Sequence, residues 1–345
     1  MAIPHAFGRS DPFTVGIEEE LFVLDADTLV PVPVPTEMLD GVRRKAELFA
    51  SVVELNTGIC ADVAQAGEEL QALRADARRR AGAAGLVLAA AGTWPPAVSE
   101  EQPITEDPGY HAFVEYAGSA ARRQYCSGLH VHVGVSSPEA CMERLEAVLP
   151  WLPLVLALSA NSPYTAGKET GLASARAELL TLLPRSGAPP VFDSYGEWER
   201  FAERLVELGL ADQITRIWWD VRPHPRYGTL EVRMPDQPTR LETTLALAEL
   251  VRALVMRAEP GPPADRGLYA QNRWAALRFG PEAELVHPSA ERLEPARELL
   301  RGFGERFDLN EEVESLSGLD QAREQVELGR REGLRSVCER LVSLT

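Results

Sequence analysis

The chain has 345 residues, of which 45% are hydrophobic and 25% are charged, a profile typical of soluble globular proteins. Its 52 acidic and 35 basic residues give a formal net charge of −17, which argues against binding to nucleic acid or to an anionic membrane surface. The four cysteines form no CxxC pair, the N-terminus lacks the profile of a signal peptide, and the apolar run around 145–160 is broken by Pro150 and Pro153. These features predict a reducing, cytoplasmic location without a membrane span.

In chain order, the first two thirds of the sequence alternate between strand-like and helical patterns. Strand-like runs lie at 13–24, about 50–56, 86–92, 128–136 and 228–234. Amphipathic helical patterns, with apolar residues three or four positions apart, lie at 65–83, 138–160, 196–209 and 239–258. Ser194 is the expected N-cap of the third helix.

After about residue 262 the strand pattern ends, and helical, charged sequence runs to residue 345. This order predicts an α+β fold, in which a mixed sheet has helices on one side and a helical C-terminal section follows. No Pro/Gly-rich break is long enough to indicate a domain linker. We therefore expect 1–345 to form one catalytic domain, with a strand-rich core at about 13–235 and a helical section at about 239–345.

Four of the expected strands place charged or imidazole side chains opposite an apolar face, because alternate residues of a strand point to opposite sides. The polar positions are Glu18 and Glu20, Glu54, His130 and His132, and Glu231 and Arg233. For any single strand, a sheet face exposed to water explains this pattern equally well. However, the set contains no lysine, and the apolar flanks indicate central strands, where uncompensated carboxylates are costly. We therefore expect a bound cation on this face.

Glu18 and Glu20 should lie about 7 Å apart along the strand, a spacing that suits two cations better than one chelate. Clusters of carboxylate oxygens favour Mg²⁺, with Mn²⁺ as the alternative, and the absence of cysteine argues against structural zinc. Arg233 shares its face with Glu231 and suits a metal-bound phosphate, and Arg222 could extend that positive rim. The sequence has no GxxxxGK[ST] loop, so a nucleotide would be held by metals and arginines.

The motifs together resemble those of the bacterial type-2 glutamate–cysteine ligases, also called carboxylate–amine ligases. The segments are GIEEELFVLD, VVELNTG, SGLHVHVGV, ALSANSPYTAGKETGLASARAEL, RIWWDVRPHPRYGTLEVRMPDQPT and NRWAALRFG, which span about residues 13–285. Related strand motifs of the forms ExE, SGxHxH and ExRxPD make the chain similar to glutamine synthetase at the superfamily level.

This resemblance implies a glutamine synthetase-like fold, with a mainly antiparallel sheet whose one face forms the active site. It also implies a reaction in which ATP phosphorylates the γ-carboxylate of L-glutamate and the amine of L-cysteine then displaces phosphate. ATP and Mg²⁺ are the implied cofactors, and small molecules are the implied partners. Relatives of this family are often oligomeric, which suggests self-association.

The resemblance further implies roles for single residues. Glu20 and Glu54 match the acids of a first metal site, and Glu18, His130 and Glu231 match a second site nearer the transferred phosphoryl group. Arg233 matches an arginine that contacts the ATP phosphates, and His132 matches a histidine near the phosphates or glutamate; both are expected to act in catalysis. Arg222 is a further candidate for contact with nucleotide phosphate or substrate carboxylate. Glu19 has no matching role.

Several alternatives stay open at this level. The acceptor could be another amino acid, a peptide or a polyamine, and a non-catalytic nucleotide or glutamate sensor would need fewer of the matched acids. The metal site of amidohydrolases also includes an HxH motif on a strand. Those enzymes need further histidines and a βα barrel, whereas this chain has only six histidines and no repeating βα pattern. Residues 165–171 and 184–190 could be lids over the site or ordinary surface loops. His224 is expected to be structural or on the surface, and at most one of Trp218 and Trp219 can stack on adenine.

Overall fold

A computed structural model describes the chain except for residues 1–2, 212–213, 215, 291, 308 and 310. Its centre is a seven-stranded sheet in the order β10-β11-β5-β1-β3-β2, with β4 paired to the last part of β1. The strands are β1 (Val15–Asp25), β2 (Arg44–Ala46), β3 (Val52–Asn56), β4 (Leu86–Ala89), β5 (Leu129–Gly134), β10 (Val221–His224) and β11 (Thr229–Val232). All pairings between these strands are antiparallel.

The register of the sheet aligns the polar positions of neighbouring strands. Glu18 of β1 lies opposite His130 of β5 on one side and opposite Asn56 of β3 on the other. Glu20 lies opposite Glu54, and Glu231 of β11 lies opposite His132. Because cross-strand neighbours point to the same face, the acids and histidines gather on one side of the sheet. The predicted polar face is therefore present.

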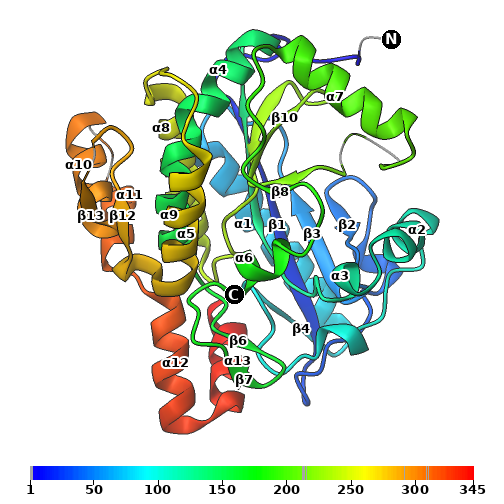
Figure 1. Cartoon of the computed structure of the whole chain (residues 1–345). Coiled ribbons are helices and arrows are strands. Elements are labelled where there is room, and N and C mark those ends of the chain that lie inside the picture. Colours follow the sequence, from blue (N-terminus) through cyan, green and yellow to red (C-terminus); the bar gives the residue numbers. More distant parts are fainter. Residues whose placement is uncertain (1–2, 212–213, 215, 291, 308, 310) are drawn as a thin grey trace.

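Helices cover the other, apolar face of the sheet (Figure 1). They are α1 (Val63–Ala83), α4 (Pro138–Val148), α5 (Leu152–Ser159) and α8 (Leu241–Arg257), and α9 (Arg266–Phe279) packs behind α5. The helix expected over 138–160 is divided by the short helix η3 (Leu149–Trp151). Pro150 and Pro153 explain the division, since proline lacks the backbone N–H that a continuous helix requires.

The middle part of the chain contributes four further helices. On the polar side, α2 (Pro108–Ala117) and α3 (Ser119–Arg122) flank the sheet, and α6 (Ala175–Leu180) and α7 (Tyr195–Glu207) follow later in the chain. Ser194 caps α7 by accepting a hydrogen bond from the Glu197 N–H, as the sequence predicted. Short turns of 3-10 helix are η1 (Thr36–Met38), η2 (Ser99–Glu101), η4 (Gly280–Glu282) and η5 (Leu316–Gly318).

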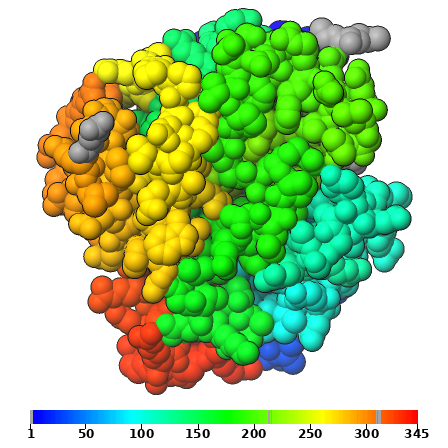
Figure 2. Space-filling view, viewed as in Figure 1, coloured from blue at the N-terminus to red at the C-terminus, as the bar shows by residue number. Residues whose placement is uncertain are grey.

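The C-terminal section contains α10 (Ala296–Phe307), α11 (Glu311–Ser315), α12 (Gln321–Glu332) and α13 (Leu334–Leu344). It covers one side and the lower end of the molecule, away from the segment that carries α2 (Figure 2). The section is not wholly helical, because β12 (Glu284–Val286) and β13 (Leu293–Pro295) form a small hairpin. Two further pairs lie outside the main sheet: β6 (Tyr164–Thr165) with β7 (Lys168–Glu169), and β8 (Ser186–Gly187) with β9 (Trp218–Trp219). None of the described helices is long and apolar enough to cross a membrane.

Candidate active site

The polar face of the sheet forms the floor of a cavity of about 610 Å³. Side chains of β1, β2, β3, β5, β10 and β11 line it, and residues 105–110 around the start of α2 form part of its rim. All eight residues that the sequence singled out line this one cavity: Glu18, Glu20, Glu54, His130, His132, Arg222, Glu231 and Arg233. They come from four separate stretches of sequence and meet only because of the strand register.

Two groups of side chains in the cavity are arranged so that each could hold a cation. Glu18, His132 and Glu231 form one group, and each offers a ligand atom within 4.8 Å of the others. Burial alone would raise the pKa of Glu18, but the charge of His132 and hydrogen bonding to His130 and His132 outweigh it and hold that pKa well below its usual value. Glu18 is therefore an ionised, ligand-competent carboxylate at neutral pH.

Glu20, Glu47 and Glu54 form the second group, with ligand atoms again within 4.8 Å of one another. Burial, together with the charges of Glu54 and Glu20, raises the pKa of Glu47 well above its usual value. Lys45 is the nearest described cation, with its Nζ 3.2 Å from Glu54 Oε1. Three carboxylates facing one lysine leave negative charge in excess, which is the electrostatic condition of a divalent-cation site.

The histidine positions differ in detail from the sequence assignment. Nδ1 of His130 lies 3.2 Å from Glu18 Oε2 and its Nε2 lies 3.9 Å from Glu20 Oε1, so His130 stands between the two groups. His132 is the histidine that joins Glu18 and Glu231, with Nε2 3.4 Å from Glu18 Oε1 and Nδ1 2.9 Å from Thr229 Oγ1. The assignment of His130 to the second metal remains a prediction, because His132 is the histidine with a ligand atom within 4.8 Å of both Glu18 and Glu231.

Glu231 joins the acidic groups to the two predicted arginines. Nε and Nη2 of Arg222 donate to the two carboxylate oxygens of Glu231, at 2.7 and 3.2 Å, and Nη1 of Arg233 donates to Oε1 at 2.5 Å. Burial would raise the pKa of Glu231, but Arg222 and Arg233 hold it well below its usual value. The Arg222 side chain is 8% exposed and that of Arg233 is 19% exposed, so Arg233 presents more of its guanidinium to the cavity.

The SG dipeptide before β5 fixes the position of Glu20. The N–H of Gly128 donates to Glu20 Oε2 at 2.5 Å, and the hydroxyl of Ser127 donates to the Glu20 main-chain oxygen. A Cβ atom on Gly128 would lie 2.1 Å from Nη2 of Arg176, which is buried beside it. Glycine is therefore required here so that the main chain can approach both Glu20 and Arg176.

Residues that the sequence did not single out complete the walls of the cavity. His224, expected to be structural or on the surface, lines it and stacks on Tyr227 with ring centroids 4.3 Å apart. Burial lowers the pKa of His224 to about 3, so this ring is neutral at physiological pH. Lys45 and Glu47 were missed because β2 and the turn after it are too short to give a periodic signal, although their alternation resembles that of the other strands.

The two adjacent tryptophans separate as expected. Trp219 is buried and packs on Phe192 and Phe201, whereas Trp218 lines the cavity beside Phe113, with ring centroids 4.9 Å apart. A smaller space of about 130 Å³ continues from the cavity toward Phe49, Phe113 and Trp218. Cys126, Gln124 and Arg176 also line this space, which gives it apolar, aromatic and cationic groups together.

Glu19, which points away from the cavity, has a separate function in the fold. It is fully buried on the helical side, where both its oxygens accept hydrogen bonds from Arg74 of α1, at 2.7 and 2.8 Å. Gln237 and Thr244 also donate to Oε1 of Glu19. The same Gln237 accepts a hydrogen bond from the Glu20 N–H, so this cluster anchors β1 from behind.

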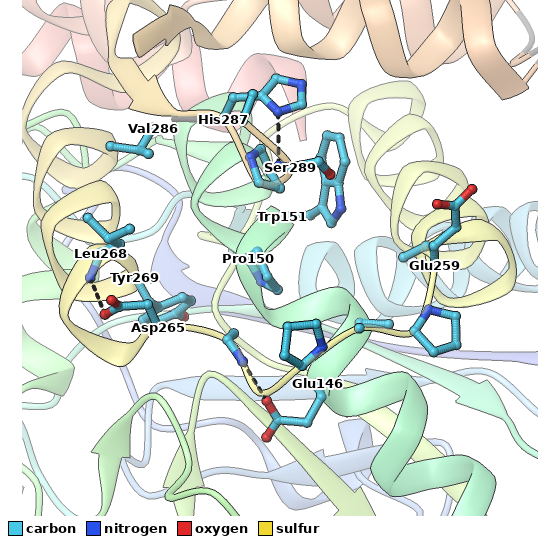
Figure 3. A pocket seen from close by; sticks show the side chains of 18 of the residues that line it. Glu146, Pro150, Trp151, Glu259, Asp265, Leu268, Tyr269, Val286, His287 and Ser289 are labelled. Atoms are coloured by element: carbon cyan, nitrogen blue, oxygen red, sulfur yellow. Dashed lines mark hydrogen bonds between the residues drawn. The ribbon is translucent and has the colours of Figure 1, made fainter. Parts of the chain in front are cut away.

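The two candidate lid segments are not among the described residues that line the cavity. Residues 165–171 form the β6–β7 turn, which is bonded to Pro95 and Ala97, and Glu169 pairs with Arg330. In residues 184–190, β8 pairs with β9. A second large cavity, of about 580 Å³, lies elsewhere, between the α4–α5 turn, the start of α9 and the β12–β13 hairpin (Figure 3). It contains none of the predicted site residues.

Comparison with known proteins identifies the family. The pattern of "Glutamate-cysteine ligase family 2" matches residues 14–335. The chain is 41% identical to the "Putative glutamate–cysteine ligase 2-3" of Rubrobacter xylanophilus, covering 98% of this chain and 99% of that one. It is 35% identical to the "Glutamate–cysteine ligase" of Haloferax volcanii, covering 97% and 98% of the two chains.

Among solved structures, the chain is similar in fold to the glutamate–cysteine ligase of Francisella tularensis, which was solved in complex with AMP. The TM-score is 0.69 at 15% sequence identity, and the match covers 97% of this chain and 90% of the other. The match confirms the glutamine synthetase-like α+β fold that the motifs implied. On its sequence, this chain belongs to glutamate–cysteine ligase family 2.

Proposed function

We propose that the chain is an ATP-dependent ligase that joins the γ-carboxylate of L-glutamate to the amine of L-cysteine, giving γ-glutamylcysteine, ADP and phosphate. The observation that carries the proposal is the pairing of two acidic groups with a guanidinium on one face of the sheet. Glu18, His132 and Glu231 lie on one side, Glu20, Glu47 and Glu54 on the other, and Arg233 contacts Glu231. Such an arrangement suits a polyphosphate held by divalent cations.

The donor set fits Mg²⁺ or Mn²⁺ rather than a softer metal. Five of the six side chains in the two groups are carboxylates, and no cysteine belongs to either group. The raised pKa of Glu47 supports this reading, because a cation would relieve the repulsion among the three carboxylates. When bound, the cations would neutralise phosphate oxygens and stabilise the charge that develops during phosphoryl transfer.

Arg233 is proposed to bind the transferred phosphate group, because its guanidinium is the more accessible of the two at Glu231. Arg222 donates two hydrogen bonds to Glu231 and one to the Ile217 carbonyl, so it mainly keeps Glu231 ionised and in place. His132 lies beside Glu18 and Glu231 and is proposed to contact phosphate or glutamate from the floor of the cavity. These roles divide the two arginines into one that binds and one that positions.

The proposed chemistry balances in two steps. An oxygen of the glutamate γ-carboxylate attacks the γ-phosphorus of ATP, which forms γ-glutamyl phosphate and releases ADP. The amine nitrogen then attacks the acyl carbon, phosphate leaves with the bridging oxygen, and the amine loses a proton. Phosphorylation is needed because a free carboxylate is a poor electrophile at neutral pH.

The small space beyond the main cavity supports an amino acid as the acceptor. Its aromatic walls, Phe49, Phe113 and Trp218, suit a small apolar side chain, and Arg176 supplies a buried cation for a carboxylate. A volume of about 130 Å³ favours an acceptor of the size of cysteine over a peptide. The four cysteines of the chain are free thiols, which fits the cytoplasmic location that we infer.

The test is phosphate release from ATP with Mg²⁺ and L-glutamate, in the presence of single amines, with the products identified by mass spectrometry. We expect release that depends on cysteine and a product with the mass of γ-glutamylcysteine. Release that depends on a different amine would show that cysteine is not the acceptor, while the proposed type of reaction would stand. If the folded chain binds ATP but releases no phosphate with any amine, the protein is a nucleotide sensor and not a ligase.

A further inference from the structure

The main chain of Arg233 is held from both sides by residues outside the sheet ladder. Arg233 is the first residue after β11, and its N–H donates to the Asp220 carbonyl at 2.9 Å. Its own carbonyl accepts a hydrogen bond from Nη2 of Arg176 at 3.1 Å. Asp220 and Arg176 therefore set where the Arg233 side chain enters the cavity.

The side chain of Asp220 points to the helical layer, where it is almost completely buried. Its Oδ2 accepts hydrogen bonds from the Tyr269 hydroxyl at 2.6 Å and from Nε of Arg273 at 2.7 Å. Its Oδ1 accepts a third, from Nη2 of Arg273 at 3.3 Å. Tyr269 and Arg273 both belong to α9, and all three residues are at most 6% exposed. The cluster therefore joins α9 directly to the residue that holds the Arg233 N–H.

Arg273 also reaches the second support of Arg233. Its Nη2 donates to the Ala177 carbonyl at 3.0 Å, and Ala177 follows Arg176 in α6. The Arg273 guanidinium thus connects Asp220, which accepts the Arg233 N–H, with α6. That helix carries Arg176, which donates to the Arg233 carbonyl. Arg273 belongs to the NRWAALRFG segment, to which the proposed reaction assigns no role.

We propose that Arg273, Asp220 and Tyr269 are positioning residues for Arg233, and that they set how well the enzyme uses ATP. The inference rests on the proposed function, in which Arg233 binds the transferred phosphate group. A guanidinium must lie within hydrogen-bond distance of the phosphate oxygens, so a displacement of about 1 Å is enough to lower the rate strongly. Because none of the three side chains lines the main cavity, their effect on ATP is exerted through Arg233.

A second ion pair on the same helix provides a matched control. Arg266, at the start of α9, donates to both oxygens of Glu146 at 2.7 and 2.5 Å, and so fastens α9 to α4. Figure 3 shows Glu146 and the start of α9 at the cavity behind the sheet, where Glu146 also accepts a hydrogen bond from the Ala264 N–H. The contacts described for Arg266 involve neither Asp220 nor Arg176. Loss of this pair should therefore loosen α9 and leave Arg233 in place.

The experiment compares Arg273→Lys and Tyr269→Phe with Arg266→Lys in the full-length chain. It measures KM for ATP, KM for glutamate, Mn²⁺ affinity and Tm. A lysine cannot reach Asp220 and Ala177 together, and phenylalanine removes a single hydroxyl. We expect KM for ATP to rise about tenfold in Arg273→Lys, by analogy with the roughly 10- to 100-fold losses seen when groups that orient metal ligands are removed. In Tyr269→Phe, which removes one of the hydrogen bonds to Asp220, the rise should be smaller. Mn²⁺ affinity and KM for glutamate should change less than twofold, and Arg266→Lys should lower Tm without raising KM for ATP.

Each outcome decides between the claims. An unchanged KM for ATP in both α9 variants, beside an active wild type, would overturn the positioning role and leave the proposed function standing. An equal rise in Arg266→Lys would also overturn it, because general loosening of α9 would then explain the effect. If Arg273→Lys does not fold, Tyr269→Phe alone decides. If the folded wild type does not bind ATP at all, both the proposed function and the positioning role are wrong.

Discussion

Glu54 is the most deeply buried carboxylate of its acidic group. It lies on the central strand β3, is 6% exposed, and shares its group with Glu20 and Glu47. Lys45 is the nearest described cation. Because one lysine faces three carboxylates, the negative charge of the group is incompletely balanced. A buried carboxylate of this kind is costly unless a cation compensates it, which is why we assign it to metal binding.

We predict that Glu54→Gln retains the fold and loses metal affinity and turnover. Glutamine is of similar size and keeps hydrogen-bonding capacity, but it removes a charged ligand, so Mn²⁺ affinity should fall by at least about tenfold. Titration of Mn²⁺ followed by electron paramagnetic resonance measures the effect. The matched control is Glu106→Gln at the rim of the same cavity, where the side chain is 94% exposed. Unchanged turnover in Glu54→Gln would remove the assignment of this acidic group.

We predict that Arg233→Ala separates nucleotide use from metal binding. A charge-assisted hydrogen bond contributes about 1.5–3 kcal/mol, so kcat/KM for ATP should fall about 10- to 100-fold. Mn²⁺ affinity should stay within a few-fold of wild type, since Arg222 still pairs with Glu231. Parallel measurements of ATP kinetics and Mn²⁺ binding decide the point. Equal losses of both would mean that Arg233 supports the metal group and not the phosphate.

At the scale of elements, β1 carries two functions on its two faces. Glu18 and Glu20 face the cavity, while Glu19 between them pairs with Arg74 on α1. Gln237 links the Glu19 side chain to the Glu20 main chain, so the buried pair and the acids that we propose to bind metal share a support. The run of three glutamates is thus explained by the alternation of the strand.

We predict that Glu19→Gln destabilises the protein by about 3 kcal/mol, because it leaves Arg74 buried without its partner charge. Burial raises the pKa of Glu19, but Arg74 outweighs it and holds the pKa below the usual value near 4.5. The ion pair therefore contributes fully above about pH 4.5, and its contribution is lost as the pH falls through the lower folded-state pKa. Urea unfolding of both proteins as a function of pH measures this. A stability difference that grows toward low pH would contradict the assignment.

We predict that Gly128→Ala impairs activity more than stability. The added Cβ would lie 2.1 Å from the Arg176 guanidinium, so Arg176 must move and its hydrogen bond to the Arg233 carbonyl should be lost. Assay of phosphate release beside thermal unfolding separates the two effects. The control is Gly82→Ala in α1, where a Cβ meets no atom within 4 Å. Wild-type turnover in Gly128→Ala would show that the glycine has no functional role.

The strands and their polar faces could be predicted because their alternation is strong and their apolar flanks are long. The sequence placed strand-like runs at 13–24 and 128–136, and the structure has β1 and β5 at Val15–Asp25 and Leu129–Gly134. Glu47 could not be predicted, since β2 spans only three residues and pairs solely with β3. The sequence also could not show that His132, and not His130, lies beside Glu231. This placement depends on the register between β5 and β11, which is set by tertiary structure.

At the scale of the whole molecule, the site and its support lie in different parts of the chain. The cavity is lined by residues between Glu18 and Arg233, whereas the sequence after Arg233 supplies helices behind the sheet. Glu19, Asp220 and Asp236 are carboxylates whose partners lie on the helical side or in the segments bordering it. Buried polar contacts of this kind hold the sheet in one arrangement, which a site built from several strands requires.

The net charge of −17 is consistent with a protein that handles anionic substrates only with the help of cations. The acidic groups in the cavity repel ATP and glutamate unless their charge is offset. Turnover should therefore be lost when divalent cations are removed by a chelator and restored when Mg²⁺ is added. In the proposed reaction, the glutamate carboxylate must also be activated covalently before the amine reacts.

The most direct test of that central claim follows the oxygen of the γ-carboxylate. L-glutamate labelled with ¹⁸O in its γ-carboxylate is incubated with the enzyme, ATP, Mg²⁺ and cysteine, and the released phosphate is analysed by mass spectrometry. We predict one ¹⁸O atom in each phosphate, because the oxygen that bridges carbon and phosphorus leaves with phosphate. Phosphate without ¹⁸O, formed together with γ-glutamylcysteine, would contradict the acyl-phosphate route.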